Sequence, residues 1–500
     1  MKRLLTGGAV AVAVAAIVGT VTAAGGPPQF LTFPILLHVG EDGLDHGHFV
    51  FSEEVAVPGP LAKDLGSADY APAATGVTLL TSPGVSDADV SGSPGSYEGE
   101  TGAAFSGSVL VGGSNHIFPG ACSASAAPGT AGDCAPLAYI SSDGTSWVRR
   151  SMSRVVNGAT FGIAFDPAID YDKAGNFYYS YGVAPLGGSY PNGIAVSKSS
   201  ADGLSWASPV AVTFNRNRAF DDKYYIAIDR SNTTFANRIY VSWDRNQGNN
   251  QILYISSSSN SGASWSTPVK VNDGKTSFER VIGAYPAVDH TSGVVYDSWH
   301  DYAKNVIYVD KSTTGGATWG TDRAAATTHA GFGQDIGCVG GRAQGPAHAL
   351  KVGPSGKLYL VYADPVKNRG FDVLLTTSAN GGTTWTAPKT LNDDTTSGDQ
   401  FHPTLSVESN GSGGDKVTVT FYDRRDDGSN CAAHVYATQS VDSGTSWSVN
   451  IRETTAPSNF DGNPNGPGDY SSSSPAFGSV YPFFSDHRST DYEIYTADVH

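Results

Sequence analysis

The chain has 500 residues, of which 16% are charged, and its formal net charge at pH 7 is −16. It contains no run of Lys or Arg that could neutralise phosphates, so the composition argues against a nucleic-acid partner or an anionic membrane surface. The 60 Gly, 24 Tyr and 21 Phe residues are typical of many short strands joined by turns. These values favour an acidic, all-β protein with a large core.

Residues 1–24 have the pattern of a secretory signal peptide. Lys2 and Arg3 precede a stretch rich in Ala, Val, Leu and Ile, which ends in the small residues Ala23 and Ala24. No second apolar run of that kind follows. We therefore expect a secreted, extracellular monomer without a membrane span.

Four cysteines in an exported chain allow three pairings. Cys122 and Cys134 belong to one predicted loop, so a local disulfide between them is the simplest choice. That choice leaves Cys338 and Cys431 to join two later loops.

Residues 25–97 form an irregular segment rich in Gly, Pro, Ser and Ala. Only two stretches in it, around Phe49–Val57 and Val77–Leu80, have the composition of strands. The segment resembles no independent domain, and the repeats described next begin only after it.

From residue 98 to residue 500 one plan recurs: an inner strand, an often aromatic second strand, a third strand, a tight turn and a short outer strand. The turn is clearest in Ser440–Trp447, where an Asp can accept backbone N–H bonds, a Gly permits positive φ and a Trp covers the core. Its six copies are spaced 54 to 66 residues apart, which is a period of repeat architectures. They end in Trp147, Trp206, Trp265, Trp319, Trp385 and Trp447.

This turn resembles the Asp-box, or bacterial neuraminidase repeat, of the sialidase-like superfamily. The resemblance implies a β-propeller of four-stranded blades, each with a Trp-anchored turn between its two outer strands. Seven second strands can be counted, which favours seven blades over the six of catalytic sialidases. The seventh blade runs out of chain before its outer strand, so we expect the N-terminal segment, around Val77–Leu80 or Phe49–Val57, to supply that strand and close the ring.

Strands in a blade alternate in direction, so the box turns and the turns after the inner strands share one face. Function is expected on the opposite face. Sialidases resemble this architecture and bind the substrate carboxylate with three Arg, attack with a Tyr activated by a Glu, and use an Asp as general acid. The residues that match these roles in the loops before the inner strands are Arg218, Arg280 and Arg342 for the clamp, Tyr470 or Tyr285 as nucleophile, Glu100 as its partner and Asp222 as the acid.

The leading hypothesis is therefore a sialidase-like glycoside hydrolase that acts on an anionic sugar. The Phe/Tyr-Arg-Ile-Pro signature of sialidases is absent, which keeps open a non-catalytic propeller that binds glycans or proteins. A polysaccharide lyase is the third possibility, with His402 or Tyr285 as base beside Arg342. No cofactor is required, although a structural Ca²⁺ could be held by the acidic loops at Asp426-Asp427-Gly428 or Asn392-Asp393-Asp394.

Overall fold

The computed structural model describes residues 68–72, 74–75, 87–92 and 97–500, apart from 118–121, 128–129, 131, 187–190, 217–218, 248–249, 275–279, 331–333, 335, 340–346, 463–465 and 490. It also gives the backbone pairing of β1 (Leu36–Val39) with β2 (Asp45–Val50). The predicted signal peptide lies outside the described residues. No helix in the described part of the chain is long and apolar enough to cross a membrane.

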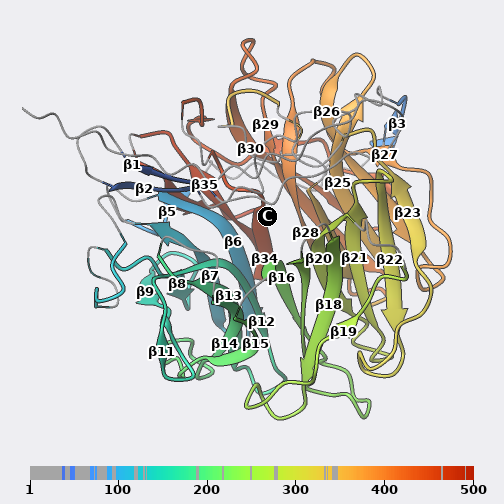
Figure 1. The fold of residues 1–500 in the computed structure, drawn as a ribbon. Helices are drawn as coiled ribbons and strands as arrows, with labels where there is room; N and C mark the ends of the chain where they lie inside the picture. The colour runs from blue at the N-terminus through green and yellow to red at the C-terminus, as the bar shows by residue number, and fades with distance from the viewer. Residues whose placement is uncertain are drawn as a thin grey trace, which may run out of the picture.

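Seven small antiparallel sheets surround one axis and form a seven-bladed β-propeller, as the sequence predicts (Figure 1). We number the blades 1 to 7 in the order of their inner strands. These are β6 (Tyr97–Ser106), β12 (Ile163–Tyr171), β16 (Phe220–Ile228), β20 (Val281–Val288), β24 (His348–Val352), β28 (Gln400–Ser409) and β34 (Ser472–Ala476). The second strands are β7 (Val109–Ile117), β13 (Phe177–Ala184), β17 (Ile239–Gln247), β21 (Val295–Asp301), β25 (Leu358–Val366), β29 (Asp415–Asp423) and β35 (Ser479–Asp486).

The outer half of each blade is shorter and less regular. The third strands are β8 (Leu137–Ser141), β14 (Asn192–Lys198), β18 (Asn250–Ser258), β22 (Val306–Ser312), β26 (Gly370–Ser378), β30 (Ala432–Ser440) and β36 (Glu493–Thr496). The outer strands of blades 1 to 6 are β9 (Val148–Ser151), β15 (Val210–Asn215), β19 (Val269–Lys270), β23 (Arg323–Thr327), β27 (Lys389–Thr390) and β32 (Ile451–Arg452). Small additions are β10 (Val155–Val156) paired with β11 (Ala159–Thr160), and β33 (Ser458–Asn459) on β30.

A strand of the N-terminal segment closes the ring. It is β5 (Ala88–Asp89), which pairs antiparallel with β36, so that blade 7 also has four strands. Val90 continues the ladder by donating its N–H to the carbonyl of Ile494 at 2.8 Å. Closure from the N-terminal side is thus confirmed, and β6 lies beside β34 (Figure 1).

The residues expected to close the ring are wrong. Residues 77–80 and 51–57 lie outside the described part of the chain, and Phe49 and Val50 belong to β2, which pairs with β1. The strand that closes the ring is only two residues long and directly precedes the first blade. It has no alternating apolar pattern, because it is only two residues long and both of its residues are exposed.

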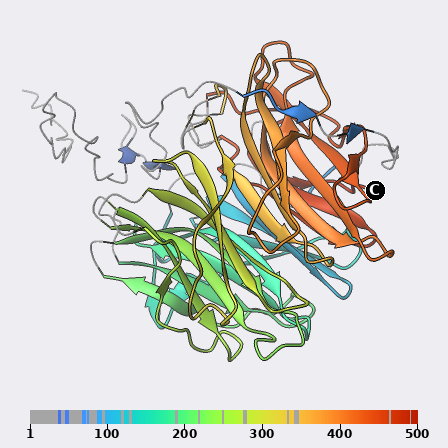
Figure 2. The same cartoon turned by 90° about the vertical axis from the view of Figure 1, so that its right-hand side faces the viewer.

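The N-terminal segment also runs along the outer edges of two other blades. β3 (Ala71–Pro72) lies parallel to β27 of blade 5, and β4 (Ala74–Thr75) lies parallel to β31 (Ser446–Trp447) of blade 6. In Figure 2 short blue strands lie against the orange part of the chain. The described strands β3, β4 and β5 thus pair with the outer parts of blades 5, 6 and 7, where they cover strand edges that would otherwise be open.

The repeated turns are built as their sequence predicts. In Ser440–Trp447 the carboxylate of Asp442 accepts the N–H groups of Thr445 and Ser446 at 3.0 and 2.9 Å, and the hydroxyl of Ser440 accepts the N–H of Gly444 at 2.8 Å. Gly444 has φ 80°, a conformation that favours glycine. These bonds satisfy backbone N–H groups of the turn within the turn itself.

Each turn also joins its blade to the preceding one. The Cα of Gly444 in blade 6 lies against the ring of Tyr359 in blade 5, where an added Cβ would be 3.4 Å from the nearest ring carbon. The apolar clusters follow the same rule, because each large cluster contains strands of two neighbouring blades. Trp447 is fully buried, whereas the other five box Trp side chains are half-buried, so they cap these interfaces rather than fill them.

Both predicted disulfides are present. Cys122 pairs with Cys134, and Cys338 pairs with Cys431. The second disulfide ties the segment before blade 5 to the start of β30 in blade 6, across a sequence separation of 93 residues. It limits how far this segment can move from the face on which function is expected.

We predict that Trp447→Ala lowers the free energy of unfolding by about 3–5 kcal/mol and that Trp385→Ala lowers it by roughly half as much. Both indoles donate to the carbonyl of their own turn glycine, at 3.3 and 3.2 Å, so the pair differs mainly in burial. Urea unfolding of the two variants measures this difference. Equal losses would contradict the packing account.

Candidate functional site

Five of the seven inner strands break their pairing near the start, at equivalent places. The register with the second strand shifts at Glu100 in β6, Asp166 in β12, Lys223 in β16, Gly283 in β20 and His402 in β28. All five residues have positive φ, between 45° and 75°. For the four that are not glycine this conformation is strained, and such strain in a buried residue is concentrated at functional sites.

The bulges bring charged groups of non-adjacent blades together at the axis. The Lys223 ammonium in blade 3 lies 2.5 Å from the Asp469 carboxylate, which precedes the inner strand of blade 7. It also lies 3.8 Å from Glu100 in blade 1 and 4.0 Å from Asp166 in blade 2. We call Glu100, Asp166, Lys223 and Asp469 the axial cluster. All four are nearly inaccessible to solvent.

Asn115 in β7 fixes the two acidic residues of blades 1 and 2. Its amide nitrogen donates to Glu100 Oε2 at 2.5 Å and to Asp166 Oδ1 at 3.3 Å, while its oxygen accepts the N–H of Asp166. On the other side, the N–H of Asp469 donates to Glu100 Oε1 at 3.2 Å. Gly468 must be glycine for this approach, because its φ is 80° and an added Cβ would meet Glu100 Cγ at 2.6 Å.

Burial and neighbouring charges shift the pKa values of Glu100, Asp166 and Lys223. Burial raises the pKa of Glu100 well above its usual range, and the charge of Asp166 raises it further. Burial also raises the pKa of Asp166, against the charge of Lys223. Burial lowers the pKa of Lys223, but Asp469 and Glu100 outweigh this effect and raise it above its ordinary value. These shifts favour a protonated Glu100 carboxyl and a charged Lys223 ammonium.

Three half-buried tyrosines lie next to the axial cluster. Tyr225 in β16 has ring-centroid distances of 4.7 Å to Tyr285 and 5.3 Å to Tyr470. The Lys223 ammonium is 6.0 Å from the centre of the Tyr470 ring. Burial, followed by the charges of Asp166 and Glu100, raises the pKa of Tyr470 well above its ordinary value. Its hydroxyl thus stays protonated.

Four of the predicted site residues lie in or next to the axial cluster and the three tyrosines beside it. Glu100 belongs to the axial cluster, Tyr470 follows Asp469, and Tyr285 is joined to both through Tyr225. Asp222 precedes Lys223 and faces Asp244 across the β16–β17 pair, where its charge and burial raise the pKa of Asp244. The prediction that these residues lie in the loops before the inner strands is wrong for Glu100, Asp222 and Tyr285, which lie within β6, β16 and β20, at or beside the bulges.

Of the three arginines of the predicted clamp, Arg280 belongs to the described residues. Arg280 is buried at the start of β20, where it pairs with Gln251 and its carbonyl accepts the N–H of Tyr302 at 3.0 Å. Arg218 and Arg342 lie outside the described residues. The convergence of the three guanidinium groups stays a prediction.

Lys223, Asp166 and Asp469 were not among the predicted site residues. The sequence does hold a signal for some of the bulges, since Asp166 and His402 are each followed by a proline inside a strand. Proline cannot donate to the ladder, so an X-Pro step within a buried strand marks a bulge. Lys223 has no such marker.

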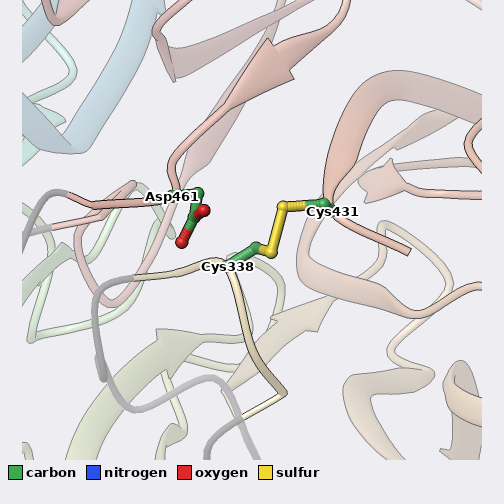
Figure 3. Close-up of side chains that lie close together, drawn as sticks. All are labelled: Cys338, Cys431 and Asp461. Atoms are coloured by element: carbon green, nitrogen blue, oxygen red, sulfur yellow. A yellow bond between two sulfur atoms is a disulfide. The ribbon is translucent and has the colours of Figure 1, made fainter. Parts of the chain in front are cut away.

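The acidic loops proposed to hold Ca²⁺ are occupied by protein donors. Asp427 accepts the N–H groups of Ser429, Cys431 and Ala432, and Asp393 accepts the guanidinium of Arg425 at 2.6 Å. Among the described residues, one group of three candidate metal ligands lies close together, namely Cys338, Cys431 and Asp461 (Figure 3). Its two sulfur atoms are bonded to each other and are therefore not thiolate ligands.

No protein-family model matches the chain, and no curated protein matches it. Among solved structures, an ulvan lyase is similar with 12% identity and a TM-score of 0.47, over 86% of this chain and 95% of that one. A Hadza microbial sialidase has 13% identity and a TM-score of 0.44, over 77% and 75%. The intramolecular trans-sialidase of Ruminococcus gnavus has 12% identity and a TM-score of 0.41, over 85% and 98%. The seven-bladed propeller is assigned here from the strand pairing of this chain.

We predict that Lys223→Met destabilises the protein by about 3–5 kcal/mol at pH 8, because buried carboxylates lose their counter-charge. The loss should be smaller at pH 5. Without the ammonium the folded-state pKa values of Glu100, Asp166 and Asp469 rise, and a carboxyl with a raised pKa stabilises the fold at low pH and loses this contribution as the pH rises above about 4.5. Urea unfolding at both pH values measures the effect. A pH-independent loss would show that Lys223 does not compensate these acids.

Proposed function

We propose that the chain is a glycoside hydrolase whose reaction centre is the axial cluster. The observation that carries this proposal is the convergence of three carboxyl groups from three blades on one ammonium, together with the burial that raises the pKa of Glu100. Glycoside hydrolysis needs one protonated and one ionised carboxyl group, since one carboxylic acid protonates the leaving oxygen while a carboxylate attacks or activates water.

Glu100 is suited to be the general acid. Burial holds its proton at neutral pH, and its protonated carboxyl hydrogen-bonds to Asp166. Asp469 is suited to be the ionised partner, because the Lys223 ammonium lies 2.5 Å from its carboxylate. Lys223 then stabilises the charge that Asp469 carries, while Asn115 fixes the direction of the Glu100 carboxyl.

The half-buried tyrosines give this centre a surface for a sugar ring. Tyr225, Tyr285 and Tyr470 form a continuous aromatic group beside the charged residues. Sugars stack their apolar faces on aromatic rings while their hydroxyls bind polar groups. Because the pKa of Tyr470 is raised, we assign the attack to a carboxylate, and we assign stacking to Tyr470 and Tyr285.

We further propose that the substrate is an anionic sugar. This part of the proposal rests on Arg218, Arg280 and Arg342. Lys223 is already paired with Asp469, so a substrate carboxylate needs a different cation. Arginine is the appropriate residue, because its planar guanidinium binds a carboxylate with two parallel hydrogen bonds.

A substrate panel tests both parts. We expect the purified protein to release the fluorophore from an acidic glycoside, either a sialoside or a uronide, and Arg342→Ala to raise KM for that substrate. Turnover of neutral glycosides alone would support the proposed hydrolase activity but contradict the proposal that the substrate is acidic. Products that absorb in the near ultraviolet would indicate a lyase, and the absence of any turnover would favour a binding propeller.

We predict that Glu100→Gln lowers kcat by roughly 10²–10⁴-fold on glycosides with poor leaving groups and much less on aryl glycosides with good ones, because only the former need a proton. The matched control is Glu453→Gln. Glu453 is also a buried carboxyl, whose pKa burial raises to about 8, but it lies beyond the outer strand of blade 6. Equal losses in the two variants, or a loss independent of the leaving group, would contradict the role of Glu100.

A further inference from the structure

A cavity lies at the end of the propeller axis opposite to the axial cluster. It has a volume of about 560 Å³ and is lined by the last residues of the inner strands and by the turns that follow them. We call it the box-face funnel, since these turns share a face with the box turns. A smaller space of about 50 Å³ adjoins it toward Tyr225 and Tyr285, and Lys351 lines both.

One part of the funnel wall is apolar, and polar residues such as Thr291 and Ser406 line the rest. The apolar part is contributed by inner strands of several blades, and among its residues are Phe105, Ile169, Ile226, Leu405 and Val407. A volume of this size lies within the range of sites that bind small molecules. The apolar part of the wall favours an apolar body in the ligand.

One cation in the funnel is left without a carboxylate partner. Arg230 is paired with Asp170 at 2.6 Å, and Glu408 faces Lys416 at 3.8 Å. Among the described residues no carboxylate lies within ion-pair distance of Lys351, whose ammonium is 5.7 Å from the centre of the Tyr285 ring. Lys351 lies where the funnel meets the smaller space, because it lines both.

His290 adds no second positive charge to this lining. Burial and the charge of Arg230 lower its pKa to about 4, so its ring is neutral at pH 7. The ring accepts instead, with its Nε2 lying 2.8 Å from the Arg230 guanidinium. The funnel thus combines an apolar part with one ammonium that has no carboxylate partner among the described residues.

We propose that the box-face funnel binds a medium-chain alkyl carboxylate, with the carboxylate at Lys351 and the alkyl chain along the apolar part of the wall. An ammonium beside an apolar surface is complementary to an anion that carries an apolar tail. This inference does not rest on the proposed hydrolase, whose centre is on the other face.

Calorimetric titration at pH 7.5 tests the proposal with two probes of equal length, decanoate and decanol. We expect saturable one-to-one binding of decanoate and at least tenfold weaker binding of decanol, because only the former engages Lys351. Acetate should not bind, since it lacks the tail. No binding of decanoate, or equal binding of decanoate and decanol, would overturn the proposal without any variant.

Substitutions then locate the site. Lys351→Met should weaken decanoate binding about tenfold or more and leave decanol unchanged, while Lys351→Arg should retain most of the affinity. The matched control is Lys198→Met, because Lys198 also lies over a tyrosine ring, at 5.5 Å from the centre of Tyr178, but does not line the funnel. Unchanged decanoate binding in Lys351→Met, or an equal loss in Lys198→Met, would contradict the assignment.

Discussion

The inner strands of this propeller do not complete their hydrogen-bond ladders, and the candidate site depends on that constraint. A regular strand places alternate side chains on its two faces, so it would direct few groups along the axis. The bulges at Glu100, Asp166 and Lys223 instead hold residues with positive φ, and they turn charged side chains toward one another across blades. The strain of these conformations is offset by the ion pairs and by Asn115, which fix the bulges in one arrangement.

The propeller supports this arrangement because its packing is between blades rather than within them. Every large apolar cluster joins two neighbouring blades, and the box turns lie against the second strand of the preceding blade. A ring held in this way has no free end once β5 pairs with β36. The ion pair between Lys223 and Asp469 then spans the axis from blade 3 to blade 7, so closure of the ring also sets the geometry of the site.

The sequence predicts the fold well because its signals are local and repeated. The Ser440–Trp447 turn contains its own hydrogen bonds, and the second strands are often aromatic and recur with the same period, so both can be recognised without knowledge of the contacts between blades. The closing strand could not be located in this way, because Ala88 and Asp89 form a two-residue edge strand whose partner is about 400 residues away. The disulfides followed from simple proximity in sequence and from elimination.

The site was harder to predict, for a physical reason. Glu100, Tyr285, Tyr470 and Asp222 were chosen by their place near the inner strands, and the structure gathers them. Lys223 and Asp469 become important only through a contact between blades that are distant in sequence, and a pattern of residue types does not encode that contact. The Asp166-Pro167 and His402-Pro403 steps are the local signals that mark two of the bulges.

The central claim is that the axial cluster holds a protonated carboxyl beside an ionised one at neutral pH. Neutron diffraction from deuterated crystals at pH 7 would show the exchangeable deuterons directly. The account predicts a deuteron on the Glu100 carboxyl, none on Asp469 and a fully deuterated Lys223 ammonium. A Glu100 carboxylate without a deuteron, or a deuteron on Asp469, would contradict it.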